Sequence, residues 1–250
     1  MFTIAAFSES QDPGGVAVPM AGVPDQHMRV VGDQIFINQF NRLMGAFSCA
    51  GASATLVRLI SPSLRRVNPL IVRPLELGLT PAGNPVHDVD INRSLPLVTD
   101  EGLECHITSN PAAAEQASTV IFLSDSQIQM VAGSIFTIHF QVTLALVAGA
   151  WAFAEIDLVD ELPLGQYSVV GGALLAANGV AFRFVPVGGM NRPGAPTVPD
   201  EDNDVIIPFR FGNLGEWFKF HTTSPPGVEI LSSAAAASAT YDGYMDIIPA

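Results

Sequence analysis

A long stretch without charged residues constrains the fold of this chain most. Between Val131 and Ala154 there is no Asp, Glu, Lys or Arg, a length that would suffice for a membrane-spanning helix. Within the stretch, however, apolar and polar residues alternate. The apolar members are Phe136, Ile138, Phe140, Val142 and Leu144, and the polar residues between them are Thr137, His139, Gln141 and Thr143. A period of two is that of a strand buried on one face, so the pattern predicts a β-strand and not a transmembrane helix.

Short apolar runs separated by Pro, Gly and Asn continue the pattern along most of the chain. In the first half they are Thr55–Ile60, Leu70–Val72, Leu95–Val98, Leu103–Ile107 and Thr119–Leu123. In the second half they are Ser134–Leu146, Ala152–Leu158, Gln166–Val170, Val180–Val187, Val205–Phe211, Trp217–Thr223 and Val228–Leu231. Short strands with frequent turn signals predict an all-β sandwich or barrel. Residues 28–48 fit either a helix or strands, and the pattern leaves both open.

One motif occurs twice. In Glu101–Pro111 and Glu216–Pro226 a Glu, a His, a Thr, a Ser and a Pro stand at the same positions, and an alanine-rich run follows each copy. Asn68–Arg73 is echoed upstream of the second copy by Asn178–Arg183. Features that recur in the same order predict an internal duplication. About eight strands per half then predict two tandem jelly-roll β-sandwiches.

The predicted domain boundaries follow from this duplication. Residues 1–27 are interrupted by proline and glycine and are expected to form an extended N-terminal arm. Residues 28–125 are expected to form the first jelly roll and residues 126–250 the second. Two irregular segments, Glu76–Asp90 and Gly188–Asp204, are expected to be long loops that are either functional or flexible.

The repeated motif also predicts which side chains are buried. The residues expected to face the core are Leu103, Cys105 and Ile107 in the first copy, and Phe218, Phe220 and Thr222 in the second. Those expected to point away are Glu104, His106 and Thr108, with Lys219, His221 and Thr223 as their counterparts. The two histidines, His106 and His221, are equivalent under this alignment.

Composition favours self-association over nucleic-acid binding. Hydrophobic residues make up 48 % of the chain and charged residues only 14 %, so much of the surface is expected to be covered in an assembly. The net charge is −13 and Lys219 is the single lysine. A protein that coats nucleic acid directly needs a basic arm or patch, and none is predicted here. Met1–Ser10 has neither a basic start nor a sustained apolar stretch, so no secretory signal is expected.

The histidine pair raises the hypothesis of a metal site like that of cupins, the metal-binding jelly rolls. Such a site needs several ligands, typically two histidines one residue apart followed by an acidic residue and a third histidine. Each copy of the motif has one histidine and no partner at that spacing. We therefore interpret His106 and His221 as polar-face residues that hydrogen-bond to a neighbouring strand.

Other candidate sites have simpler interpretations. Asp200–Asp204 places carboxylates at alternate positions but lacks the glycine and glutamate that would complete an EF-hand, so a solvated acidic loop is favoured over a divalent-cation contact between subunits. Cys105 is expected to be a small buried hydrophobe, and a disulfide between Cys49 and Cys105 stays open, although nothing in the sequence indicates an oxidising compartment. No nucleophile elbow, P-loop or dinucleotide motif is present. The sequence predicts no catalytic, cofactor-binding or metal-binding residue.

Two compact β-units in tandem, without an enzyme motif and with few charges, resemble the double jelly-roll major capsid proteins of icosahedral viruses over roughly residues 28–250. The resemblance implies a structural coat protein whose trimeric capsomers self-assemble into an icosahedral shell, alongside other virion proteins. In several members an internal membrane separates the shell from the genome. The implied location is the virion, after synthesis in the host cytoplasm.

Three alternatives stay open from the sequence. The chain could be a jelly-roll enzyme, either a bicupin or a glycan-processing hydrolase. It could be a binding module of a surface array. It could also be a minor virion protein, such as a penton or spike.

Overall fold

The computed structural model describes residues 1–11, 16–50, 54–64, 70–72, 74–76, 94–109, 115–125, 131–198 and 215–250. These residues form strands and connecting turns and contain no α-helix, so the predicted all-β class is confirmed. In the described part of the chain, no helix is long and apolar enough to cross a membrane. The undecided segment 28–48 is also β-structure: β3 (Arg29–Val31), β4 (Gln34–Phe36) and the start of β5 (Arg42–Ala50).

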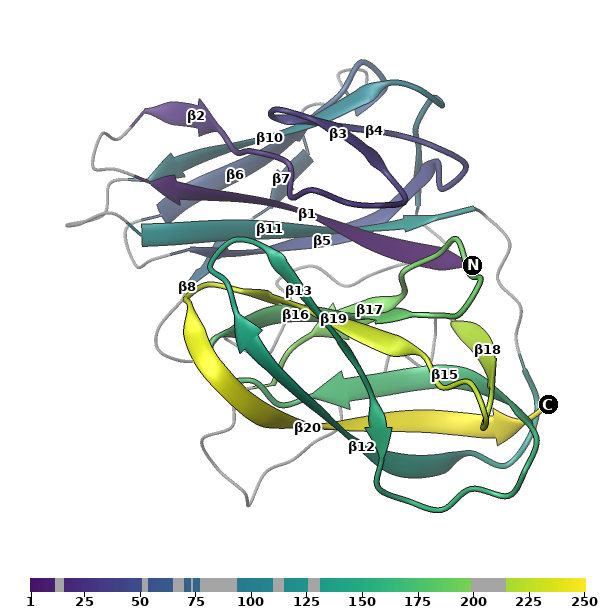
Figure 1. The fold of residues 1–250 in the computed structure, drawn as a ribbon. Coiled ribbons are helices and arrows are strands. Elements are labelled where there is room, and N and C mark those ends of the chain that lie inside the picture. Colours follow the sequence, from purple (N-terminus) through teal and green to yellow (C-terminus); the bar gives the residue numbers. More distant parts are fainter. Residues whose placement is uncertain are drawn as a thin grey trace.

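The first sandwich consists of two sheets (Figure 1). One has the order β1-β11-β5-β8, with β9 also paired to β5. Its strands are β1 (Phe2–Gln11), β5, β8 (Pro74–Glu76), β9 (Leu95–Pro96) and β11 (Glu115–Ser124). The other has the order β3-β4-β10-β6-β7, with β2 also paired to β10. Its remaining strands are β2 (Ala17–Pro19), β6 (Ala54–Ile60), β7 (Leu70–Val72) and β10 (Gly102–Ser109).

The second sandwich has the sheet orders β14-β12-β20-β15-β18 and β13-β19-β16-β17. The first of these sheets contains β12 (Phe136–Leu146), β14 (Asp157–Leu158), β15 (Gln166–Leu174), β18 (Phe218–His221) and β20 (Ala236–Pro249). The second contains β13 (Trp151–Glu155), β16 (Gly179–Val185), β17 (Gly194–Pro196) and β19 (Gly227–Ser232). The alternating pattern is confirmed from Ile138 onward, because Ile138, Phe140, Val142 and Leu144 are all buried. Phe136, predicted to lie on the same buried face, is 53 % exposed at the start of the strand, so the prediction is wrong for this residue.

Both sandwiches have the jelly-roll strand order. In a chain of eight strands, two Greek keys place strands 1, 8, 3 and 6 in one sheet and strands 2, 7, 4 and 5 in the other. The second sandwich follows this order with β12-β20-β15-β18 and β13-β19-β16-β17. The first sandwich follows it with β1-β11-β5-β9 in one sheet. In its other sheet β10 is strand 7, and both β2 and β4 pair with β10 at the place where strand 2 lies in the jelly-roll order.

The prediction that residues 1–27 form an extended arm is wrong. The prolines and glycines begin only at Pro13, so residues 2–11 are free of both, and β1 pairs with β11 from Phe2 to Gln11. β2 likewise pairs with β10. The N-terminal segment is therefore part of both sheets of the first sandwich.

β1 is buried on both faces, and this joins the two sandwiches. Ala5 and Phe7 lie in the core of the first sandwich. Phe2, Ile4 and Ala6 belong instead to a hydrophobic cluster that continues into the second sandwich. The four sheets are stacked in layers, with the β1 sheet packed against the β16 sheet (Figure 1).

The structure separates the two copies of the repeated motif. Leu103, Cys105 and Ile107 are buried on β10, and Phe218 and Phe220 are buried on β18, as predicted. Thr222, predicted to face the core, is only partly buried and lies just beyond β18. Each of the six residues expected to point away is at least partly exposed.

The equivalence of His106 and His221 is wrong. His106 lies on β10, the seventh strand of its jelly roll, whereas His221 lies on β18, the sixth strand of the other. The similarity between Asn68–Arg73 and Asn178–Arg183 also joins strands that differ by one position, because it aligns β7, the fifth strand of the first jelly roll, with β16, the fourth strand of the second. The shared strand order is a property of the fold, and the internal duplication stays a prediction.

The two predicted long loops are described only in part. Gly188–Asp204, expected to be irregular, contains β17, a buried edge strand paired with β16. Residues 199–204 and 77–90, and with them the acidic run Asp200–Asp204, lie outside the described residues.

Candidate functional site at the seam between the sandwiches

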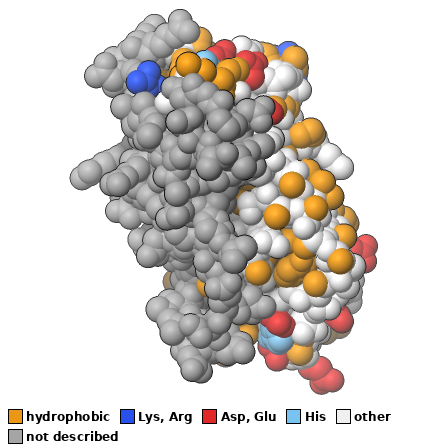
Figure 2. Space-filling model, turned by 90° about the vertical axis from the view of Figure 1, so that its left-hand side faces the viewer, with side chains coloured by type: hydrophobic (Ala, Val, Ile, Leu, Met, Phe, Trp, Pro, Cys, Tyr) orange, Lys and Arg blue, Asp and Glu red, His pale blue; other side chains and the backbone are white. Residues whose placement is uncertain are grey.

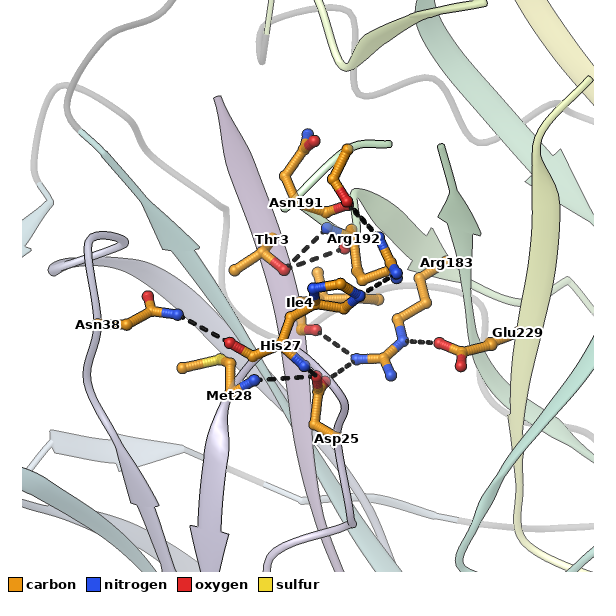
Figure 3. A network of polar contacts seen from close by, with 11 residues as sticks. Thr3, Ile4, Asp25, His27, Met28, Asn38, Arg183, Asn191, Arg192 and Glu229 are labelled. Atoms are coloured by element: carbon orange, nitrogen blue, oxygen red, sulfur yellow. Dashed lines mark hydrogen bonds and ion pairs between the residues drawn. The ribbon is translucent and has the colours of Figure 1, made fainter. Parts of the chain in front are cut away.

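A buried arginine lies at the centre of the seam, the contact layer between the β1 sheet and the β16 sheet (Figure 3). Arg183 projects from β16 and is 1 % exposed. Its Nε donates to Oε2 of Glu229, the cross-strand neighbour on β19, at 2.6 Å. Its Nη1 donates to the carbonyl oxygen of Ile4 on β1 at 3.0 Å and also to the carboxylate of Asp25. One guanidinium thus connects three segments from both sandwiches.

The surroundings of Arg183 are almost dry. The side chains of Asp25 and Glu229 are 3 % and 15 % exposed. The guanidinium carbon also lies 4.1 Å from the ring centre of Trp151, a cation–π contact. Buried ion pairs contribute little net stability, because desolvation offsets the Coulombic attraction. Their geometry is specific, however, so the network fixes how the sandwiches are placed against each other.

A second set of hydrogen bonds ties the segment before β17 to β1. The backbone N–H of Ile4 donates to the carbonyl oxygen of Arg192 at 2.8 Å, and the N–H of Arg192 donates to Oγ1 of Thr3 at 3.0 Å. Asn191 donates through Nδ2 to the carbonyl oxygen of Trp217 at 2.8 Å. β1 is therefore hydrogen-bonded to the second sandwich as well as packed on it.

His27 accepts a hydrogen bond from the second arginine of the seam. Nη2 of Arg192 donates to Nε2 of His27, and since a guanidinium can only donate, this imidazole is neutral. Burial lowers the pKa of His27, and the positive charge of Arg192 lowers it further. Asp25 orients the same turn, because its Oδ1 accepts from the N–H groups of His27 at 2.7 Å and Met28 at 3.2 Å.

A cleft of about 680 Å³ opens beside this network. Arg192 and His27 line it together with three exposed apolar residues. These are Phe153, Val187 and Met190, with exposed fractions of 55 %, 71 % and 64 %. Glu155 and residues Ser224–Gly227 also belong to the walls. The cleft has the size of a binding site, and it combines apolar walls with one cationic side chain, Arg192, and one anionic side chain, Glu155.

The residues that the sequence singled out do not meet in one site. Nε2 of His106 lies 3.2 Å from Oε2 of Glu104 on the same strand, and Nδ1 of His221 lies 2.8 Å from Oγ1 of Thr223. Within the described ranges, no group of three or more His, Cys, Asp or Glu residues is arranged to hold a metal ion. No motif or spacing in the sequence had indicated that Asp25, His27 or Glu229 belongs to a site.

Both cysteines are buried and free, so the burial predicted for Cys105 is confirmed and the two thiols form no disulfide. Burial raises the pKa of Cys49 and of Cys105 to about 12, so neither thiol is activated as a nucleophile.

Comparison with known proteins adds one structural likeness. No protein-family model matches the chain, and no curated protein matches it. The crystal structure of the major capsid protein P2 from bacteriophage PM2 aligns with 100 % of this chain and 97 % of its own, at 11 % sequence identity and a TM-score of 0.24.

Proposed function

We propose that this chain is a structural coat protein, the major capsid protein of an icosahedral virus, which assembles through trimeric capsomers. One observation carries the proposal: two sandwiches with jelly-roll strand order are joined through a sheet that is buried on both faces. Their long strands run in roughly the same direction, so the connecting loops gather at the two ends of the block (Figure 1).

The seam suits this role physically. A subunit in a shell must keep its shape while its outer surfaces contact neighbouring subunits, because flexibility between its two sandwiches would add an entropic cost to every contact. The buried charges around Arg183 and the hydrogen bonds to β1 oppose sliding of one sandwich along the other.

The described surface also suits self-association. Where β12 finishes and β20 begins, the small apolar residues Ala145, Val147, Ala148, Ala234 and Ala235 are exposed. Figure 2 views this end of the molecule, and the described part of the face shows many apolar side chains with few charged ones among them. A net charge of −13 opposes direct contact with nucleic acid. The proposal therefore includes a location in the virion shell, other virion proteins as neighbours, and an internal membrane as one form of inner boundary.

Measuring the mass of the purified chain tests the proposal. We expect trimers or larger closed assemblies in analytical ultracentrifugation over a wide range of protein and salt concentrations, and regular particles by electron microscopy. A strictly monomeric chain under all these conditions would contradict a coat function. Stoichiometric bound metal that is lost in His106→Ala or His221→Ala would instead support a jelly-roll enzyme.

A further inference from the structure

The cleft beside the seam contains a buried cation without a direct counter-ion. Arg192 is 6 % exposed, and among the described residues no carboxylate forms an ion pair with it, because Asp25 and Glu229 both pair with Arg183. Its hydrogen bonds go to the carbonyl oxygens of Gly189 and Asn191 and to His27. These contacts engage three of the five guanidinium N–H groups. Burial lowers the pKa of Arg192, and the charges of Glu229 and Asp25 raise it in part. The two N–H groups that these contacts leave unused are the ones that a further carboxylate would accept from.

The walls of the cleft require an apolar partner. Phe153, Val187 and Met190 are each more than half exposed although they face a concave surface. Exposed apolar side chains that line a cleft are typical of a site that a partner covers. The matching occupant carries a protruding apolar side chain next to a carboxylate.

The chain itself has such a segment, the 159–164 loop between β14 and β15. Leu164 is 78 % exposed, the highest fraction among the large apolar residues described, and Val159 is 50 % exposed. Asp160 and Glu161, between them in sequence, are exposed as well. The loop is partly fixed in place, since Oδ2 of Asp160 accepts from the backbone N–H of His139 at 2.7 Å. Because Leu164 is so exposed, the loop does not fill the cleft of its own chain.

Two other loops offer a weaker match. Val31, 57 % exposed, stands near Asp33, and Val98, 63 % exposed, stands near Asp100. Each has one exposed apolar residue where the 159–164 loop has two. The further carboxylate near Val98 is engaged, because Glu101 accepts from the N–H groups of Val98 at 2.9 Å and Ser63 at 3.0 Å.

We propose that the cleft receives the 159–164 loop of a second copy of this chain. Leu164 then packs against the apolar walls, and Glu161 reaches Arg192. We take the contact as heterologous, with the loop of each copy in the cleft of the next. Such a contact forms a closed ring when the rotation between copies closes, and a rotation of one third of a turn gives the trimer of the proposed capsomer. The inference rests on the proposed coat function and assigns the residues that would hold its capsomer together.

Two surface substitutions test the two sides of the contact. Leu164→Asp damages the loop and leaves the cleft intact, whereas Met190→Glu damages the cleft and leaves the loop intact. Both side chains are exposed, so circular dichroism and thermal midpoints should match the wild type. We expect each variant alone to raise the dissociation constant of the assembly by at least about tenfold, because each loses the burial of a large apolar side chain. Val98→Asp, a matched change on another loop, should leave assembly unchanged.

Mixing the two variants gives the decisive result. Only one combination of intact surfaces remains, the cleft of Leu164→Asp with the loop of Met190→Glu, so the mixture should form one-to-one heterodimers that do not grow further. A mixture that stays monomeric would overturn the proposal, as would loss of assembly in Val98→Asp but not in Leu164→Asp. Loss in Met190→Glu alone would mean that another segment fills the cleft, which also overturns it.

The two levels of proposal fail in different ways. If the wild type is monomeric at every concentration, the coat function itself is contradicted. If the wild type assembles and both Leu164→Asp and Met190→Glu assemble equally well, only the assigned contact is wrong.

Discussion

At the scale of single residues, Arg183 is the side chain on which the seam depends most. We expect Arg183→Met to lower the free energy of unfolding by about 3–5 kcal/mol, because it leaves the carboxylates of Asp25 and Glu229 buried without a counter-ion. Urea titration followed by circular dichroism measures this loss. Arg58→Met is the matched control, since Arg58 is exposed on β6, and should change stability by less than about 0.5 kcal/mol.

Removing all three charges separates the cost of an unpaired charge from the value of the pair. The triple variant Arg183→Met, Asp25→Asn, Glu229→Gln should recover much of the loss, because buried ion pairs and neutral replacements are close in free energy. A triple variant as unstable as Arg183→Met alone would contradict this explanation.

His27 should make the seam sensitive to acid. Its pKa in the folded protein is lowered below the ordinary value of 6.5, by burial first and then by Arg192. The stabilisation from the neutral ring is therefore complete above about pH 6.5 and is lost as the pH falls from there through the folded-state pKa. Protonated His27 would face the cations Arg192 and Arg183, with Asp25 and Glu229 offsetting part of the repulsion.

Substitution of His27 isolates this contribution. We expect His27→Gln, which keeps an acceptor for Arg192, to reduce the loss of unfolding free energy between pH 7 and pH 5. His106→Gln, on the outer face of β10, is the matched control, because it removes a histidine that lies outside the seam. The explanation fails if His27→Gln and wild type have parallel stability curves over this range.

Sequence patterns predict the burial of residues within one strand better than they predict which residues from different strands contact each other. Alternation was enough to predict the burial of Leu103, Cys105 and Ile107, because each strand face has a period of two. The seam was missed because its partners lie on β1, on the turn at Asp25 and on β19, far apart in sequence. The one available signal was Arg183 itself, a charge in the middle of the apolar run Val180–Val185.

At the scale of elements, β1 shows why a terminal segment can be misjudged. An arm would tolerate truncation of its apolar side chains, whereas β1 contributes one face to each core. We expect Phe7→Ala, on the face toward the first core, and Phe2→Ala, on the face toward the second sandwich, each to cost about 3–5 kcal/mol. Phe2 also makes an edge contact with Trp217, with ring centres 5.3 Å apart.

Denaturant midpoints of the two variants, with Met1→Ala as the exposed control, measure both costs. Losses near zero for Phe2→Ala would mean that β1 does not hold the second sandwich. The sequence did not reveal β1 because a strand buried on both faces has no apolar–polar alternation, and the nearby prolines and glycines dominated the pattern.

At the scale of the whole molecule, fold class and strand order differ in how far the sequence determines them. Turn signals and alternation were sufficient for an all-β fold. The echo of Glu101–Pro111 in Glu216–Pro226 matched non-equivalent strands, β10 and β18, because similar local needs recur in any jelly roll: an alternating strand that ends at a proline. Such needs produce short similarities that do not mark equivalent positions.

The seam predicts that the two sandwiches unfold together. Both tryptophans, Trp151 and Trp217, belong to the second sandwich, and both cysteines, Cys49 and Cys105, to the first. Tryptophan fluorescence therefore reports on one half of the molecule and thiol labelling on the other. Buried thiols with a pKa of about 12 stay unreactive until the first sandwich opens, whereas unfolded thiols react near pH 8.5.

Because Phe2, Ile4 and Ala6 share one hydrophobic cluster with the second sandwich, separating the halves would expose apolar surface. It would also break the hydrogen bonds that Arg183 donates to Ile4 and Asp25. We expect the fluorescence and thiol-labelling transitions of the parent protein to coincide in urea. In the Arg183→Met background they should separate, because the specific link between the layers is lost while each sandwich keeps its own core. Separate transitions in the protein that carries Arg183 would mean that the two sandwiches are independent domains, and that the seam is too weak to hold them as one rigid unit.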